Sequence, residues 1–182
     1  MKIVKKGLNA AKINKKSSAV DLMAAVGDPF QPIAVGLLLG AREAGQEILL
    51  GGGCQMLAVL ALALNEINPE LRSEFVKKVL IGTTSWLVHE SLSYSKKRNS
   101  FIHLTNHIAK HFKVNILGLA SGYRFTHSQQ KLLRDYEIGY VKEGVGAGAL
   151  SLLAQIKGLS PIEMIKLCDK EVEHLLSQNQ IK

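Results

Sequence analysis

The segment at residues 140–150, YVKEGVGAGAL, combines one carboxylate, Glu143, with three glycines that alternate with small residues. A glycine in a helix interior costs about 1 kcal/mol relative to alanine, yet the apolar stretch 150–156 that follows predicts a helix. We therefore expect either irregular backbone here or a very close approach by another group. A carboxylate held out of water has a raised pKa and can act as a general base. The alternative is that Glu143 only stabilises the positive end of a helix.

A run of three glycines, Gly51, Gly52 and Gly53, stands between a short apolar run and a predicted helix. Free N–H groups at such a turn, together with the helix dipole, can bind a phosphate. The run is neither a GxGxxG fingerprint nor a P-loop, because no Gly-Lys-Ser/Thr follows it. A tight strand-to-helix turn that binds nothing is an equally good interpretation.

Hydroxylated residues follow two further predicted strands. Thr83 and Thr84 end one of them, and Ser121 and Gly122 follow the next, with Arg124 close behind. Their hydroxyl and N–H groups can donate hydrogen bonds to a phosphate or a sugar. They are equally compatible with ordinary strand ends. No general base stands in a recognisable sequence context beside Ser121 or Cys54, so nucleophilic catalysis is not indicated.

Three histidines, His103, His107 and His111, are spaced four residues apart on one predicted helix. Two histidines at this spacing can bind a metal, but no acid or cysteine nearby in the sequence completes the set of ligands. We expect them to face solvent beside the apolar stripe and to bind no metal. The two cysteines, Cys54 and Cys168, are far apart in the sequence, as is typical of reduced thiols in a cytoplasmic protein.

The charge of the chain is concentrated at its start. Residues 1–16 hold six lysines and no acid, so subtracting them from the net charge of +8 leaves +2 for the rest of the 182 residues. Residues 1–17 show no clear pattern and are expected to form a basic arm, for which a solvated terminus is preferred over a nucleic-acid or anionic-membrane contact. The longest apolar runs, 33–41 and 56–64, have nine residues each, about half of a membrane span. A soluble, cytoplasmic protein is expected.

The pattern along residues 18–182 predicts a single α/β domain. Helices are expected at 29–44, started by Asp28 and Pro29, and at 55–67, 69–79, 99–112, 129–136 and 150–156, with one or two helical turns at 21–26. Strands are expected at 47–50, 80–88 and 114–120. A last helix begins at Ser160, which forms a capping box with Glu163. Alternating strands and helices favour a mainly parallel, Rossmann-like sheet with helices on both faces and with C-terminal helices, and ligands bind beyond the carboxyl ends of such strands.

Three stretches in this order carry a resemblance to a known family: VGDPFQPIAVGLLLGA, ILLGGGCQMLAVLALAL and YEIGYVKEGVGAGAL. The chain resembles the archaeal and cyanobacterial branch of the nicotinate-nucleotide:dimethylbenzimidazole phosphoribosyltransferases over most of residues 19–157. The resemblance implies transfer of phosphoribosyl from nicotinate mononucleotide to an aromatic base, for the lower ligand of cobalamin. It also implies a Rossmann-like sheet with a smaller helical part, a homodimer, and no metal or other cofactor.

The family's catalytic glutamate lies in a glycine-flanked EG.GAG segment, which Glu143 matches. Glu143 is therefore expected to take the proton from the attacking heterocycle, while the glycines let the flat base lie against the backbone. The expected substrate-binding residues are Asp28, Gln31, Gly51, Gly52, Gly53, Gln55, Thr83, Thr84, Ser121, Gly122, Gly144 and Gly146.

The chain departs from the family in length, because relatives are about twice as long and carry an upstream phosphate-binding segment rich in glycine and threonine. Residues 1–26 hold no such segment, so the chain is expected to be the C-terminal half of a longer architecture, with the missing N-terminal half as a partner. A non-catalytic remnant that keeps the base pocket is the alternative function. A nucleic-acid binder is disfavoured by the near-neutral body, and an oxidoreductase by the missing dinucleotide fingerprint.

Overall fold

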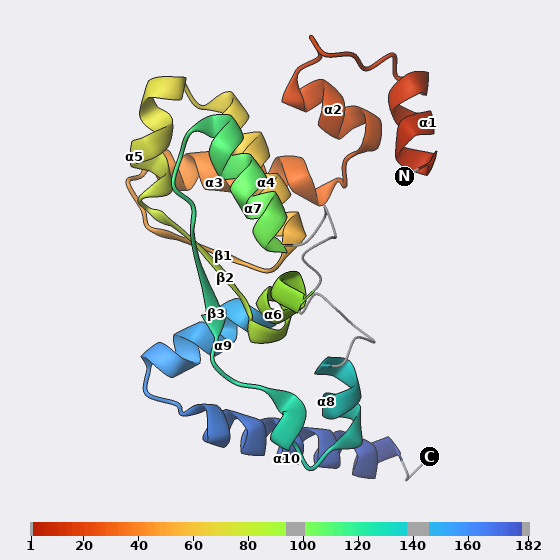
Figure 1. Ribbon diagram of the computed structural model, residues 1–182, viewed down its shortest axis with the longest axis vertical. Coiled ribbons are helices and arrows are strands. Elements are labelled where there is room, and N and C mark those ends of the chain that lie inside the picture. Colours follow the sequence, from red (N-terminus) through yellow and green to blue (C-terminus); the bar gives the residue numbers. More distant parts are fainter. Residues whose placement is uncertain (1, 94–100, 138–145, 180–182) are drawn as a thin grey trace.

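A three-stranded parallel sheet is the centre of the fold. The computed structural model describes residues 2–93, 101–137 and 146–179. Within them, β1 (Ile48–Gly51), β2 (Val79–Thr84) and β3 (Leu117–Ser121) pair in that order, all parallel. Figure 1 shows helices on both sides of this sheet. The predicted α/β class with a mainly parallel, Rossmann-like sheet is confirmed.

The described helices lie close to the predicted ranges in most cases. In chain order they are α1 (Lys2–Ala10), α2 (Ala19–Val26), α3 (Phe30–Glu43), α4 (Cys54–Glu66), the 3-10 turn η1 (Pro69–Leu71), α5 (Arg72–Val76), α6 (Ser85–Ser93), α7 (Phe101–Phe112), η2 (Phe125–His127), α8 (Lys131–Asp135), α9 (Ala147–Ile156) and α10 (Pro161–Asn179). The described residues include no helix with the length and apolar character needed to cross a bilayer.

The larger core lies between one face of the sheet and helices α3, α4, α5 and α7. Leu57, Leu60 and Leu64 of α4 and Ile81 of β2 are each at most 1% exposed. Removing a leucine or isoleucine side chain from water contributes about 1.5–3 kcal/mol. The apolar run at residues 56–64 is thus explained by burial in this core.

The opposite face of the sheet is covered by α9. Gly51 and Gly82 are neighbours in register, and a Cβ on either would meet the Ala149 Cβ, at 2.6 and 3.1 Å. Because side chains alternate along a strand, Leu80 and Leu117 point to the same face. Both line a groove together with α9 residues. The strands therefore divide their side chains between two helical layers, as a parallel sheet requires.

A second, smaller core joins the sheet to the C-terminal helices. Trp86, Tyr123, Phe125, Met164 and Ile165 form it, and all are buried. Figure 1 shows α8 and α10 side by side at the lower end of the molecule, on the far side of the sheet from α3 and α4. The predicted capping box of α10 is confirmed, because Glu163 N donates to Ser160 Oγ (3.3 Å) and Ser160 N to Glu163 Oε2 (2.9 Å).

The strand predicted at residues 80–88 is too long. β2 ends at Thr84 and the chain turns at once into α6. The β-branched and aromatic residues of this stretch favour a strand only weakly, because β-propensity depends on tertiary context. Here Leu87 packs into the larger core and Trp86 into the smaller one. A helical turn after Thr84 lets consecutive side chains enter both cores.

The N-terminal residues are also more ordered than the sequence indicates. Residues 2–10, expected to have no pattern, form α1, which lies beside α2: a Cβ at Gly7 would stand 2.8 Å from Val26 Cγ1. Ile3 remains 87% exposed, and none of the residues of α1 is buried. The sequence of α1 does carry an amphipathic helical pattern, with Ile3, Val4 and Leu8 among lysines, which the prediction overlooked.

Candidate functional site

The carboxyl ends of the three strands bring most of the sequence-predicted site residues to one edge. Gly51 lies beside Gly82 in register, and Thr84 lies beside Ser121. The glycine turn 51–53, the threonines of β2 and Ser121 with Gly122 therefore share this carboxyl edge. Gly52 N donates to Gly82 O at 2.9 Å, which extends the β1–β2 ladder into the glycine turn.

Four buried polar atoms at the carboxyl edge have no hydrogen-bond partner among the described residues. They are Thr84 Oγ1, Trp86 Nε1, Ser121 Oγ and Gln155 Nε2. Thr84 and Ser121 are only 1% and 0% exposed. A buried polar group without a partner costs about 1–3 kcal/mol, and native proteins keep few of them. Their concentration at one edge is typical of a place where a ligand or water supplies the missing bonds.

The glycines before and within α9 serve the contact between this helix and the sheet. A Cβ at Gly148 would stand 2.2 Å from the Thr83 carbonyl carbon. Gly146 has a φ of 77°, in the left-handed region, and is the N-cap of α9. The close neighbour of Gly148 is thus protein backbone, where a flat ligand was expected from the sequence. Glu143 and Gly144 lie outside the described residues.

The turn after β1 is equally tight. Gly52 and Gly53 are buried, and a Cβ at Gly52 would meet Met56 Cγ at 2.9 Å. Gly53 is the N-cap of α4 and offers no side-chain cap to it. Gln55, in the first turn of α4, is exposed. The N-terminus of α4 therefore points its positive end towards the carboxyl edge, which suits an anion.

Asp28 and Gln31 contact each other at the start of α3. Asp28 Oδ1 accepts from Phe30 N at 2.8 Å, as expected of a residue that starts a helix, and Asp28 N donates to Gln31 Oε1 at 3.3 Å. Among the residues that the structure describes, neither side chain has a recorded hydrogen bond to the strand ends. Their assignment to substrate binding stays a prediction.

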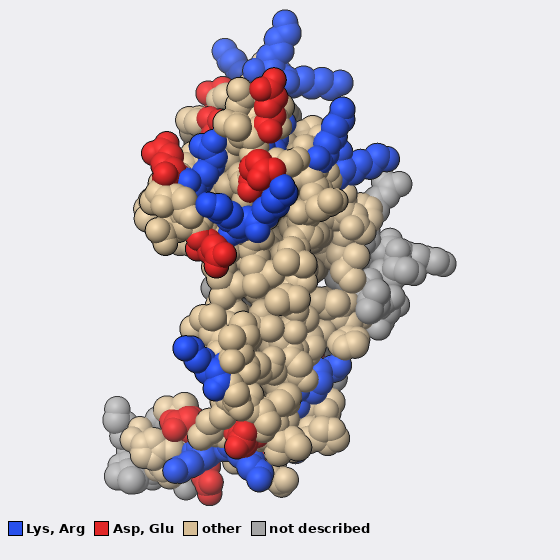
Figure 2. Space-filling view, turned by 90° about the vertical axis from the view of Figure 1, so that its left-hand side faces the viewer, with Lys and Arg blue, Asp and Glu red and all other residues tan. Residues whose placement is uncertain are grey.

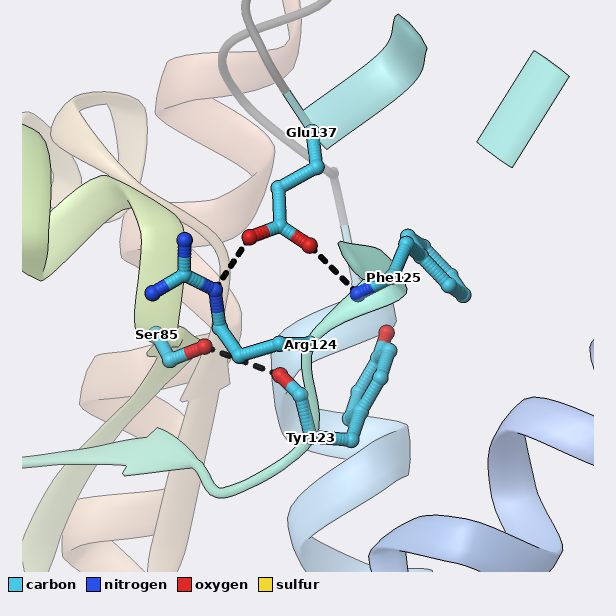
Figure 3. Close-up of polar contacts among 5 residues, drawn as sticks. All are labelled: Ser85, Tyr123, Arg124, Phe125 and Glu137. Atoms are coloured by element: carbon cyan, nitrogen blue, oxygen red, sulfur yellow. Dashed lines mark hydrogen bonds and ion pairs between the residues drawn. The ribbon is translucent and has the colours of Figure 1, made fainter. Parts of the chain in front are cut away.

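An ion pair that the sequence did not reveal lies next to the carboxyl edge. Figure 3 shows the Glu137 carboxylate between the Arg124 guanidinium and the backbone of Phe125: Arg124 Nε and Phe125 N both donate to it. The Glu137 side chain is 5% exposed and that of Arg124 is 39% exposed. Both residues, with Thr126 and Arg134, line a cavity of about 260 Å³.

The same region is made rigid by Ser85 and a group of aromatic rings. Ser85 Oγ donates to Tyr123 O at 2.9 Å (Figure 3), which ties the start of α6 to the chain after β3. Trp86 stands 5.5 Å from Tyr123 and 5.7 Å from Tyr136, ring centre to ring centre, both edge to face. Burial raises the pKa of the Tyr123 and Tyr136 hydroxyls. Both rings are therefore neutral at physiological pH.

No local signal marked Glu137 or Ser85. Arg124 was singled out as a residue after a strand, but its partner is thirteen residues further on, and no spacing rule joins the two. Ser85 was expected inside a strand. The histidines of α7 are exposed, as predicted. Among the described residues, no three of His, Cys, Asp and Glu are placed to hold a metal ion.

Together these residues can donate hydrogen bonds to a polar or anionic molecule. The edge offers uncharged hydroxyl and N–H donors, two helix N-termini and one guanidinium already paired with a carboxylate. At this edge the buried carboxylate of Glu137 is already bonded to Arg124 and to Phe125 N. Glu143 lies outside the described residues.

Comparison with known proteins gives relatives along nearly the whole chain. A UPF0284 protein of Prochlorococcus marinus (strain MIT 9313) is 49% identical over 174 residues, which are 96% of this chain and 43% of the relative. A UPF0284 protein of P. marinus (strain AS9601) is 45% identical over 180 residues, 99% of this chain and 45% of the relative. A UPF0284 protein of Methanocaldococcus jannaschii is 34% identical over 164 residues, 90% of this chain and 43% of the relative.

This chain thus spans less than half the length of these relatives, and their names state no activity or ligand. No family model matches the chain.

Proposed function

We propose that the carboxyl edge binds nicotinate mononucleotide and an aromatic base, and that the protein transfers phosphoribosyl from the first to the second. The observation that carries the proposal is the group of four buried polar atoms at this edge that have no partner among the described residues, from Thr84, Trp86, Ser121 and Gln155. The resemblance of three glycine-defined stretches to the phosphoribosyltransferases supplies the identity of the substrates.

The reaction needs one base and one electrophilic carbon. One ring nitrogen of an azole such as dimethylbenzimidazole uses its lone pair to form a bond to the anomeric carbon of the ribose. The bond from that carbon to nicotinate breaks, and its electron pair leaves on the pyridine nitrogen, which becomes neutral. The other azole nitrogen loses its proton to a carboxylate. The products are an α-ribazole phosphate, nicotinate and the protonated form of the carboxylate that accepted the proton.

Glu143 is our candidate for that carboxylate. It lies outside the described residues, but the described residues nearest to it on both sides belong to the carboxyl edge. Glu137 is paired with Arg124 after β3, and Gly146 caps α9, which packs on Thr83. A general base held in hydrogen-bond reach of the proton contributes about 10²- to 10⁴-fold in rate.

The described residues bind and orient in this proposal. The hydroxyls of Thr84 and Ser121 and the N–H of Trp86 supply hydrogen bonds to the polar groups of the substrates. The N-termini of α4 and α9 favour the negative phosphate. Holding two planar reactants in register removes much of the entropic barrier of a bimolecular reaction.

Product analysis tests the proposal. The chain is incubated with nicotinate mononucleotide and dimethylbenzimidazole, alone and together with the remainder of a relative's polypeptide, and nicotinate and α-ribazole phosphate are quantified. Equal amounts of both products are expected. Formation of neither product in either mixture would refute the activity.

The alternative is a binding domain that keeps the base pocket without catalysis. Calorimetry separates the two. Binding of both ligands is expected for the enzyme, and binding of the aromatic base alone identifies the binding domain.

A further inference from the structure

We propose that the outer edge of β3 and the adjoining face of α9 form the surface on which the rest of the relatives' polypeptide docks, adding a strand to the sheet beside β3. We call this surface the β3–α9 face and define it by Leu117, Leu119, Leu153 and Ile156. The proposal is independent of the proposed enzymatic activity.

The first argument is the exposure of β3, because the other outer strand of the described sheet, β1, is half-buried throughout. In the described part of the chain, β3 pairs with β2 on one side and with no strand on the other. Residues 117–120 are all exposed, so both faces of β3 are in contact with solvent. Parallel sheets are almost always covered on both faces, and an exposed apolar edge strand invites pairing with another chain.

The second argument is the apolar character of this surface. Leu117 is 60% exposed and Leu119 42%, and on α9 Leu153 is 46% and Ile156 71% exposed. Leu117, Leu153 and Ile156 share one groove of about 270 Å³. Single exposed leucines are common, whereas a continuous apolar patch marks an interaction site.

The four defining side chains are uncharged, and the charged residues of the groove, Glu47, Lys77 and Lys78, lie just before β1 and β2. Figure 2 shows this side of the molecule, where a band without lysine, arginine or acidic side chains crosses the middle, between charged regions above and below. Figure 1 shows β3 and, below it, the end of α9 on this side. Interface centres are depleted of charged residues in the same way.

The identity of the occupant follows from length. The match with the relative from P. marinus MIT 9313 covers 96% of this chain but only 43% of the relative. More than half of that relative's polypeptide therefore lies outside the part that this chain matches. A strand with apolar side chains, added beside β3, satisfies both the open N–H and C=O groups of the edge and the exposed leucines.

Another exposed apolar stripe provides a matched control. Phe30, Ile33 and Leu37 lie on one face of α3 and are 53%, 62% and 70% exposed. This stripe belongs to one helix and includes no strand residue. Leu37→Lys and Ile156→Lys therefore change side chains of nearly equal exposure, 70% and 71%, on two different surfaces.

The first test compares amide hydrogen exchange in this chain and in the full-length relative from P. marinus MIT 9313. We expect the peptide that covers residues 117–121 here to exchange at least ~10-fold more slowly in the relative, because a new strand bonds its outward amides. Equal exchange in the two proteins would overturn the proposal.

The second test co-expresses this chain with the part of that relative's polypeptide that the chain does not match, and measures the dissociation constant of the purified complex. We expect a one-to-one complex that Leu119→Lys and Ile156→Lys each weaken at least ~10-fold, while Leu37→Lys changes affinity less than ~2-fold. Equal weakening by Leu37→Lys, or no weakening by Ile156→Lys, contradicts the assignment.

Sedimentation of this chain alone distinguishes a second copy as the occupant. The proposal expects Ile156→Lys to leave the oligomeric state of the isolated chain unchanged. A homodimer that Ile156→Lys dissociates would assign the β3–α9 face to a second copy instead. Thermal unfolding of each variant, expected to match the parent because the substituted side chains are exposed, verifies that the fold is kept.

Discussion

Gly148→Ala is expected to destabilise the protein although alanine is the better helix former. Gly148 lies in the first turn of α9, where the helix rests on the end of β2. The added methyl carbon would lie 2.2 Å from the Thr83 carbonyl carbon, 2.5 Å from its Cα and 2.6 Å from its oxygen. All three atoms belong to the backbone of a buried strand, so no side-chain rotation relieves the contact.

The magnitude follows from two opposing effects. Carbon atoms pack best at about 3.5–4.0 Å, so α9 has to move away from β2 by roughly 1 Å or more. Overpacking of this kind costs about 1–3 kcal/mol, and the shift also weakens the packing of Ala149 on Gly51 and Gly82. The higher helix propensity of alanine stabilises the folded protein by at most about 1 kcal/mol. We expect a net loss of about 1–3 kcal/mol.

Urea unfolding measures the change, with Gly36→Ala as the control. Gly36 lies in α3, and among the described residues an added Cβ there would meet no atom within 4 Å apart from its chain neighbours and the backbone of its own helix. The same substitution there should raise the free energy of unfolding by about 0.5–1 kcal/mol. A free energy of unfolding that falls in Gly148→Ala and rises in Gly36→Ala would support the packing of α9 on β2. An unfolding midpoint of Gly148→Ala at or above that of the parent would refute this reasoning.

Two further perturbations test the polar contacts near the site. Arg124→Ala leaves the Glu137 carboxylate, 5% exposed, without its cation. We expect the free energy of unfolding, measured in urea, to fall by about 1.5–3 kcal/mol. The control Lys77→Ala, which breaks an exposed pair, should lower it by less than about 1 kcal/mol. Burial acts to raise the pKa of Asp169, but hydrogen bonds from Ser128, Gln129 and Gln130 outweigh it and lower that pKa below its usual value. The carboxylate therefore stabilises the fold at neutral pH, and the contribution is lost as pH falls below about 4. Asp169→Asn should narrow the difference in unfolding midpoint between pH 7 and pH 3, and an unchanged difference would contradict this role.

The sequence predicted the fold where local pattern and tertiary structure agree. The short apolar run at 47–50 and the apolar run at 56–64 predicted β1 and α4 nearly to the residue, because β1 is half-buried throughout and α4 buries six side chains. The hydroxyl and glycine residues after the strands were correctly expected at one edge, because parallel strands end on the same side.

The failures arose where distant residues decide the local structure. Residues 85–88 form a helix because Trp86 and Leu87 belong to different cores. Gly148 is glycine because Thr83, far away in the sequence, occupies the space of a side chain. Glu137 finds Arg124 across a loop that no periodicity describes. None of these contacts leaves a pattern within the window of residues that sequence reasoning uses.

The rate of nicotinate release by Glu143→Gln tests the central claim most directly. Glutamine keeps the size and hydrogen bonding of the side chain but cannot take the proton of the attacking base. We predict that kcat falls by about 10²- to 10⁴-fold while the affinity for nicotinate mononucleotide is retained. Glu173→Gln, at an exposed position of α10, should release nicotinate at the parent rate. Parent-like turnover by Glu143→Gln would contradict the account.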